Sequence, residues 1–451
     1  MTSATSATER LVQLVGAKDC FDIEPTELLP LQLQAANVRL EAQAQRIPLL
    51  ANRAESGGVK EIEQPADLVP LLFAHTTYKT YAEGWLNDGQ WDRMGKWLAT
   101  VSTRDVAGLD TSGVQTLDDW IKRLETVGHY LSCSSGTTGK PAMLSCTEGD
   151  IDLSARINVE ALLWATGLTR GEDRKFLGLG PQFAAPREAA IRQAMVDCFS
   201  SKYQPYQFGD GEPITVGSMV DIITLRRKLT DGTARPSEIA EFERIATQRA
   251  NDMDISAKKA IDAVVEARGL PLLATGMFAT LYQIAEGIRG TGHGGDDFNP
   301  NNAMMVAGGL KGAALPDNYR EYVMDTFNVT EDRLYHAYSM REINATFPLC
   351  HAERYHVSPW VIMLPLDAAG EKLLDPADGE IEARAAFFDA SIEGRWGGVI
   401  SGDRVSVSFA KCACGHQGPT VGREITRYAD LPGGDKITCA GSIDAYVRGV
   451  A

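Results

Sequence analysis

The segment from Ser132 to Pro141 has the residue types of a phosphate-binding loop. It reads Ser-Cys-Ser-Ser-Gly-Thr-Thr-Gly-Lys-Pro, so short hydroxylated side chains flank two glycines and a lysine follows them. Backbone N–H groups and hydroxyls in such a loop can converge on phosphate oxygens, and Lys140 adds positive charge. The segment therefore predicts a site for a phosphate-bearing ligand, and the alternative is a surface loop that binds nothing.

The spacing within this loop excludes the P-loop of kinases and other nucleoside triphosphatases. Only two residues separate Gly136 from Gly139, which is fewer than that motif requires. Pro141 also stands where the P-loop has a Mg²⁺-binding Ser or Thr, and a proline there disfavours a helix directly after the lysine.

A second group of residues has the spacing and chemistry of a metal site. Cys350 and His356 form a Cys-x5-His pair, and Cys412 and Cys414 form a Cys-x-Cys pair. Three thiolates and one imidazole match a closed, tetrahedral structural zinc site, which would join two distant segments of the chain. By position His351 and His416 are alternative ligands, and the alternative reading is that none of these residues binds a metal.

The string SSGTTGKP resembles the phosphate-binding signature of the adenylate-forming enzymes, the acyl-CoA synthetase and luciferase superfamily. In that family the loop holds the β- and γ-phosphates of ATP while a carboxylate attacks the α-phosphate, which yields an acyl-adenylate and pyrophosphate. The resemblance implies a catalytic role for Lys140. It also implies an ATP-binding loop made of Ser134, Ser135, Gly136, Thr137, Thr138, Gly139 and Lys140.

Further landmarks of the family follow in the expected order. Val306-Ala307-Gly308-Gly309 is similar to its glycine-ended strand, and Tyr338-Ser339-Met340-Arg341-Glu342 is similar to its aromatic–small–x–Thr–Glu motif. The resemblance implies that Gly308, Gly309 and Tyr338 contact the nucleotide and that Glu342 is a catalytic Mg²⁺ ligand; an aromatic face suits a purine and a carboxylate suits a hard cation. Ser339 stands where Gly is usual. Arg341 stands where a Thr meets the α-phosphate, and its charged fork could bind phosphate there.

Ser401-Gly402-Asp403 resembles the Thr-Gly-Asp motif of the family, in which the Asp accepts hydrogen bonds from the ribose hydroxyls. The family's hinge motif, which closes the large domain, can be aligned in two registers, with either Asp435 or Asp444 at the hinge. Neither register keeps the motif's Arg, so Arg427 becomes the candidate for a second ribose contact.

The region after residue 306 is most similar to the phenylacetate-CoA ligases and to the long-chain acyl-protein synthetase of bacterial bioluminescence. The shared strings are Gly308 to Lys311, Tyr-x-Met-x-Glu, Ser358-Pro359-Trp360 and Cys412 to Gly415. Some relatives of phenylacetate-CoA ligase carry a zinc clip of the kind described above. Acyl-protein synthetases pass the acyl group to a C-terminal cysteine, for which Cys439 is the candidate here. Typical superfamily members continue into a small mobile domain; its absence is expected here, either because the chain is naturally short or because it is truncated.

The resemblance implies a function in which a carboxylic acid is activated as an acyl-adenylate at the expense of ATP, with Mg²⁺. The acyl group would pass to a thiol, either that of CoA or that of a carrier or partner protein. Ser339, Arg341 and the missing lysine-bearing mobile domain motivate the alternative, a non-catalytic nucleotide-binding or scaffold homologue.

The elements that must position these residues indicate an α/β fold. Helical patterns cover Ile151 to Ala165, Ala185 to Phe199 and Pro236 to Ala267, and they alternate with short apolar runs at 176–177, 270–273 and 303–307. We expect residues 1–125 to be a helical N-terminal part of an adenylation domain, 126–345 its α/β nucleotide- and substrate-binding core, and 346–451 a strand-rich subdomain that ends at the hinge. The family fold that this implies has mixed sheets packed with helices plus a small strand-rich subdomain.

Composition narrows the class of partner. The chain has 451 residues with 44 Lys and Arg against 60 Asp and Glu, a net charge of −16, which argues against general binding of nucleic acid or anionic membranes. The N-terminal residues lack the apolar run of a secretory signal, and no run reaches the length of a membrane span. Eight scattered cysteines are too few for a disulfide scaffold, so we expect a cytoplasmic protein with reduced thiols.

Overall fold

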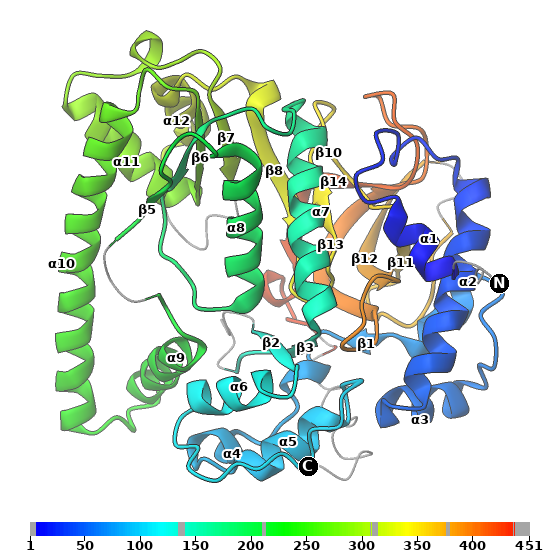
Figure 1. Cartoon of the computed structure of the whole chain (residues 1–451). Coiled ribbons are helices and arrows are strands. Elements are labelled where there is room, and N and C mark those ends of the chain that lie inside the picture. The colour runs from blue at the N-terminus through cyan, green and yellow to red at the C-terminus, as the bar shows by residue number, and fades with distance from the viewer. Residues whose placement is uncertain are drawn as a thin grey trace. The chain divides into compact units, whose positions relative to one another are not determined.

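The computed structural model describes residues 6–133, 140–209, 213–306, 308, 314–375, 379–435 and 437 (Figure 1). Contacts divide the chain into two compact units. Unit 1 consists of Met1–Ile157 together with Ser339–Ala451, and unit 2 consists of Asn158–Tyr338. The ranges 1–125, 126–345 and 346–451 follow the pattern of predicted helices and strands along the sequence, not the contacts in the structure. That division stays a prediction.

Unit 2 is built on a parallel sheet. Its strands pair in the order β5-β4-β6-β7-β8, and each of these four pairs is parallel. The strands are short and apolar, as expected when both faces of a parallel sheet are buried; Leu177, Leu273 and Met304 have no exposed surface. Their bounds are β4 Lys175–Gly178, β5 Tyr206–Gln207, β6 Leu272–Gly276, β7 Ala303–Val306 and β8 Leu334–Ser339.

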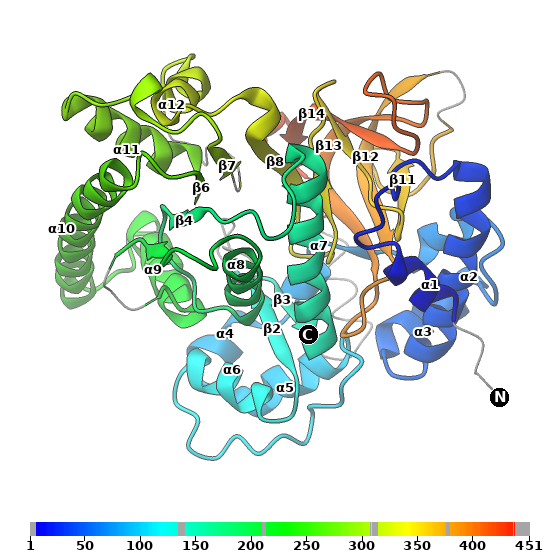
Figure 2. The same ribbon diagram turned by 45° about the horizontal axis from the view of Figure 1, so that its top comes forward.

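Helices connect and cover these strands (Figure 2). They are α8 Pro186–Phe199, α9 Val216–Thr230, α10 Pro236–Glu266, α11 Phe278–Gly290 and α12 Tyr319–Phe327, with short 3₁₀ turns at η3 Gly295–Asp297 and η4 Glu331–Arg333. Proline at the first turn of α8 and α10 costs no hydrogen bond, because that N–H has no partner within a helix. A Cβ at Gly287 of α11 would lie 2.1 Å from Ile261 Cδ1 of α10, so glycine is what lets these two helices pack closely.

Unit 1 contains an antiparallel sheet with the strand order β10-β14-β13-β12-β11. A two-residue strand, β1, pairs with β13 in parallel at Val399 and Ile400. A separate hairpin joins β2 and β3. The strands are β1 Phe73–Ala74, β2 Tyr130–Cys133, β3 Met143–Cys146, β9 Thr346–Pro348, β10 Arg354–His356, β11 Val361–Leu366, β12 Glu380–Asp389, β13 Gly398–Ser408 and β14 Thr420–Arg427.

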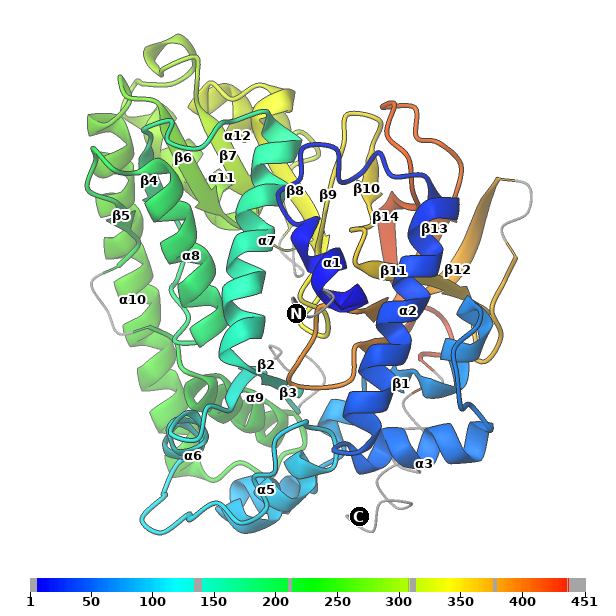
Figure 3. The same ribbon diagram turned by 45° about the vertical axis from the view of Figure 1, so that its right-hand side comes forward.

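Helices from the first third of the chain belong to this unit. The α2 helix packs beside β11 (Figure 3), and Gln32 Nε2 donates to the carbonyls of Pro359 at 2.8 Å and Val361 at 3.1 Å. Trp91 and Trp120 stack with ring centroids 6.0 Å apart between α5 and α6. The helices are α1 Ala7–Gln13, α2 Pro25–Ala44, α3 Pro48–Gly57, α4 Glu83–Asn87, α5 Trp91–Ala99 and α6 Leu117–Glu125, with 3₁₀ turns η1 Pro65–Leu71, η2 Thr77–Lys79 and η5 Tyr428–Asp430. The next helix, α7 Glu148–Thr166, contains the boundary between the units at Ile157 and Asn158.

The α/β class predicted from the sequence is confirmed, with a parallel sheet between helices in unit 2 and a strand-rich region after residue 346 in unit 1. Val399-Ile400 and the apolar run from Val405 belong to a single strand, β13. The polar residues 401–404 interrupt the apolar pattern without ending the extended backbone, so the pattern shows two strands where there is one. No helix in the described ranges is long and apolar enough to cross a membrane.

Candidate functional site

The β2–β3 hairpin frames the glycine-rich loop in unit 1. Cys133 and Met143 are register partners, so they lie opposite each other where the loop leaves and re-enters the hairpin. Of the predicted ATP-binding loop, Ser134 to Gly139 fall outside the described residues. Lys140 is described and lies just before the strand that follows.

Tyr81 anchors the end of this loop. Its hydroxyl donates to the Pro141 carbonyl at 2.9 Å, and the Lys140 ammonium donates to the Tyr81 carbonyl while lying 4.7 Å from the centre of the Tyr81 ring. Tyr81 is almost fully buried, and burial raises the pKa of its phenol well above the usual range. The lysine predicted to be catalytic is therefore held, in this structure, by a residue that the sequence did not point to.

Arg341 and Glu342 lie in a turn directly after β8. The Arg341 guanidinium donates to the Ser132 hydroxyl at 3.4 Å, although 209 residues separate the two in sequence. The fold thus brings the Arg341-Glu342 motif to the strand that leads into the glycine-rich loop, as the ATP-site interpretation requires.

The two predicted ribose contacts are also neighbours. Asp403 on β13 and Arg427 on β14 are register partners, so their side chains emerge on the same face of the sheet. The Ser401 hydroxyl accepts a hydrogen bond from the Asp403 backbone N–H at 3.0 Å, which helps to fix the Ser-Gly-Asp motif within β13.

Asp435, one of the two hinge candidates, is tied to this motif by Arg384. The Arg384 guanidinium donates to both Asp435 carboxylate oxygens, at 2.9 and 3.3 Å, and to the Ser401 carbonyl at 2.9 Å. Both side chains are almost fully buried, and the guanidinium lies 3.8 Å from the centre of the Tyr428 ring. Asp444, the other candidate, lies outside the described residues.

His75 and Lys79 complete the charged surroundings of Glu342. The His75 ring lies 3.9 Å from Asp435 Oδ2, and a Cβ at Gly402 would approach the ring to 3.2 Å, so a side chain there would crowd the imidazole. Burial lowers the pKa of both His75 and Lys79, and the nearby Glu342 carboxylate opposes the shift in each case. The Glu342 carboxylate therefore favours the charged form of both neighbouring groups.

The remaining predicted nucleotide contacts belong to unit 2. Gly308 and Tyr338 each lie two residues beyond the last register pair of β7 and β8, Val306 with His336, at the carboxyl edge of the parallel sheet. Gly308 has φ of +73°, a conformation that favours glycine, and Tyr338 is buried. Ligands of open parallel sheets bind at this edge, and the nucleotide contacts of Gly308 and Tyr338 stay a prediction. Gly309 lies outside the described residues.

The four predicted zinc ligands converge. Their ligand atoms all lie within 4.8 Å of one another, with Cys350 Sγ 3.8 Å from Cys412 Sγ and Cys414 Sγ 3.2 Å from His356 Nε2. His356 ends β10, Cys350 precedes that strand, and the two other cysteines lie in the loop between β13 and β14. Three sulfur atoms and one imidazole nitrogen at these separations fit a tetrahedral zinc ion.

Burial shapes the chemistry of this cluster. It raises the pKa of the Cys350 thiol, raises that of Cys414 to about 12, and lowers that of His356 to about 4. Without a metal the Cys350 and Cys414 thiols are therefore protonated and the His356 imidazole is neutral at about pH 7. Neither alternative ligand, His351 or His416, has its ligand atoms in the cluster found among the described residues.

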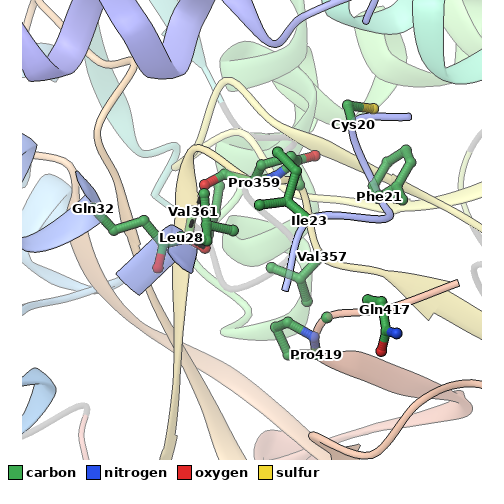
Figure 4. Close-up of a pocket in the computed structure, with 12 residues that line it drawn as sticks. Cys20, Phe21, Ile23, Leu28, Gln32, Val357, Pro359, Val361, Gln417 and Pro419 are labelled. Carbon is green, nitrogen blue, oxygen red and sulfur yellow. Dashed lines mark hydrogen bonds between the residues drawn. The ribbon is translucent and has the colours of Figure 1, made fainter. Parts of the chain in front are cut away.

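The N-terminal segment packs beside the cluster. His416 Nδ1 lies 2.7 Å from Asp22 Oδ1, and the Phe21 ring meets the His356 ring edge-on with centroids 5.8 Å apart. A small hollow lies next to this contact (Figure 4), and none of the predicted site residues lines it. It is lined by Cys20, Phe21, Ile23, Leu28, Gln32, Val357, Ser358, Pro359, Val361, Gln417, Gly418 and Pro419.

The sequence did not point to several residues that contact the predicted site residues. Tyr81, His75 and Lys79 come from a stretch near residue 80 that reads only as a connection between helices. Arg384 stands in the middle of a strand, where an arginine is usually exposed. The pairing of β1 with β13 brings the stretch near residue 80 to the sheet, but a two-residue strand is too short to be recognised in the sequence.

Comparisons with known proteins found structural similarity only. No family model matches the chain, and no curated protein matches it. Among solved structures, 2-hydroxyisobutyryl-CoA ligase in complex with its acyl-adenylate is similar with a TM-score of 0.49 and 11% identity, over 90% of this chain and 69% of that one.

Two further similar structures carry related names. The N-terminal domain of FACL13 from Mycobacterium tuberculosis has a TM-score of 0.36 and 13% identity, over 69% of this chain and 67% of that one. The amide bond synthetase Mcba from Marinactinospora thermotolerans has a TM-score of 0.36 and 13% identity, over 86% and 74%. At these scores and identities, the activities in the names remain those of the named proteins.

Proposed function

We propose that this protein is an adenylate-forming ligase, which activates a carboxylic acid with ATP and Mg²⁺ and passes the acyl group to a thiol. The observation that carries the proposal lies within unit 1. Motifs that are far apart in sequence meet there through Arg341 and Ser132, through the pairing of Asp403 with Arg427, and through the bonds from Arg384 to Ser401 and Asp435.

Each group has a role in this proposal. The loop up to Lys140 would hold the β- and γ-phosphates, Arg341 the α-phosphate, and Asp403 with Arg427 the ribose. Gly308, Gly309 and Tyr338 would hold the adenine. Glu342 is half-exposed, and its carboxylate suits a Mg²⁺ ion, which would neutralise charge on the phosphates.

The chemistry then needs two displacements. A carboxylate oxygen of the acid bonds to the α-phosphorus as the bond to pyrophosphate breaks. A thiolate next bonds to the acyl carbon, and AMP leaves with the carboxylate oxygen. The fixed cations of Arg341 and Lys140 would stabilise charge that grows on the phosphates in the first step.

We further propose that Cys350, His356, Cys412 and Cys414 hold a structural zinc ion. Each ligand has a place in a closed tetrahedral shell, so the metal would pin the loop after β13 to β10 rather than take part in the reaction. The thiols must stay reduced for this, which favours a reducing compartment, and the cytoplasm is the location we propose.

ATP–pyrophosphate exchange with a panel of carboxylic acids tests the enzyme proposal. We expect at least one acid to support exchange, and Glu342→Gln to lower the rate at least a hundredfold. Glu382→Gln is the matched control, because Glu382 on β12 is exposed and pairs with Arg404 at 3.4 Å.

The other outcomes separate the hypotheses. ATP that raises the melting temperature without any acid-dependent exchange would favour the non-catalytic nucleotide-binding homologue. If no acid supports exchange and ATP has no effect on melting, the enzyme proposal and the nucleotide-binding alternative are both wrong.

A further inference from the structure

The connection between β12 and β13 carries two buried charges that belong to none of the predicted motifs. Asp389 is the last residue of β12, and Arg395 lies shortly before β13 begins. Asp389 is 1% exposed and Arg395 is not exposed at all. Both contact the chain segment that contains Glu342.

Arg395 donates hydrogen bonds to backbone carbonyls of the segment that contains Glu342. One of its terminal nitrogens donates to the carbonyls of Arg341 at 3.1 Å and Glu342 at 2.9 Å. The other donates to the Ser145 carbonyl at 2.7 Å and lies 3.6 Å from Cys146 Sγ, on the strand that follows the glycine-rich loop. One guanidinium therefore ties the Arg341-Glu342 backbone to β3.

Carboxylates hold the other end of the segment. Asp389 Oδ2 accepts from the backbone N–H groups of Asn344 at 2.8 Å and Ala345 at 3.1 Å. Asp150, also buried, accepts from the Asn344 side chain at 2.8 Å and from the Glu393 backbone N–H at 2.8 Å. The backbone on both sides of Glu342 is thus fixed by charged groups.

The guanidinium of Arg395 is costly to bury, and each oxygen to which it donates is a backbone carbonyl rather than a carboxylate. A planar fork can reach carbonyls in two directions at once, whereas a lysine ammonium is a single point. These hydrogen bonds therefore orient the Arg341-Glu342 backbone and contribute little ion-pair energy.

We propose that Arg395 is a positioning residue, which sets the backbone of Glu342 so that its carboxylate can receive the divalent cation of a metal–nucleotide complex. This inference rests on the proposed function in one respect, that Glu342 is the metal ligand. Replacing a residue that orients a metal-binding side chain, without itself binding the metal, typically changes metal affinity by about 10- to 100-fold.

Binding of the preformed Mn²⁺·ATP complex tests this inference without catalysis, through equilibrium dialysis in which protein-bound radiolabelled ATP is counted with and without Mn²⁺. We expect Arg395→Lys to remain folded and to weaken Mn²⁺·ATP binding about tenfold. In the Glu342→Gln background, the same change should weaken binding less than twofold, because it would act only through the missing carboxylate.

Arg174 provides the matched control. It is also a buried arginine and donates to the Asn301 carbonyl, to the Leu272 carbonyl at 3.4 Å and to Glu172 at 2.9 Å, at the amino ends of the unit 2 strands. We expect Arg174→Lys to lower the melting temperature as much as Arg395→Lys does, with Mn²⁺·ATP binding within twofold of wild type.

Three results would overturn the inference. They are unchanged binding in Arg395→Lys, an equal loss in Arg174→Lys, and a full tenfold effect of Arg395→Lys in the Glu342→Gln background. Wild-type protein that binds Mn²⁺·ATP but supports no exchange with any acid would refute the proposed ligase reaction and leave the positioning role supported by the binding data. Wild-type protein that binds no Mn²⁺·ATP would contradict both.

Discussion

Zinc binding should release protons in a number that the cluster itself sets. A thiol must lose its proton to become a metal ligand, so three cysteines release at most three protons. The raised pKa values of Cys350 and Cys414 mean that both are protonated beforehand, and His356, with its pKa lowered to about 4, is already neutral at about pH 7.5. We therefore expect a release of between two and three protons for each zinc ion bound.

Calorimetry measures this number directly. Zinc is titrated into metal-free protein in three buffers with different enthalpies of ionisation, and the slope of the observed enthalpy against the buffer enthalpy gives the protons released. Saturating zinc at about 1,000 times its dissociation constant should also raise the free energy of unfolding by about 4 kcal/mol. Limited proteolysis of the loop between β13 and β14 should slow in parallel.

Two variants make the test specific. Cys414→Ser should lower the release by one proton and weaken binding strongly. Cys198→Ser should change neither quantity, because that half-buried thiol lies in unit 2, outside the cluster. A stoichiometry below half an equivalent, a release below one proton, or unchanged binding in Cys414→Ser would refute the assignment.

Two further predictions concern buried ionisable groups in unit 1. Burial lowers the pKa of His129 to about 4 from an ordinary value near 6.5, so between these values the unfolded chain binds the proton and the folded chain does not. The free energy of unfolding should therefore fall by up to roughly 3 kcal/mol as the pH drops through this window, and urea titrations should show a shallower pH dependence in His129→Gln; an unchanged slope would contradict this. Replacing Arg384 by Met leaves Asp435 buried without its ion-pair partner, which should cost about 3–5 kcal/mol in urea unfolding at pH 7. Adding Asp435→Asn should restore part of that loss, and a loss below about 1 kcal/mol would show that the buried pair is not important for stability.

Motif spacing identified the candidate residues because residues with related chemistry lie close together in the sequence. The Cys-x5-His and Cys-x-Cys pairs needed only that two loops meet, and the structure brings their four ligand atoms together. Asp403 and Arg427 were predicted separately as ribose contacts, and strand pairing makes them neighbours. Apolar runs likewise located β4, β6 and β7, since buried parallel strands carry an unbroken apolar signal.

Groups that act through the fold could not be predicted in this way. His75 reaches the Ser-Gly-Asp motif only because β1 pairs with β13, more than 300 residues later, and a two-residue strand leaves no periodic pattern. Arg395 and Asp389 flank a stretch that reads Ala-Ser-Ile-Glu-Gly, which resembles an exposed polar turn. Their burial comes from contacts with the segment around Glu342, and no local sequence property encodes it.

Isotope transfer tests the central claim, that a carboxylate is activated as an acyl-adenylate, most directly. The acid that supports exchange is labelled with ¹⁸O in both carboxylate oxygens and is incubated with ATP, Mg²⁺ and an acceptor thiol, and the products are analysed by mass spectrometry. The account predicts one ¹⁸O atom in each AMP, because the oxygen that attacks the α-phosphorus stays with AMP when the thiol takes the acyl group. Label in inorganic phosphate, or AMP that carries no label, would contradict it.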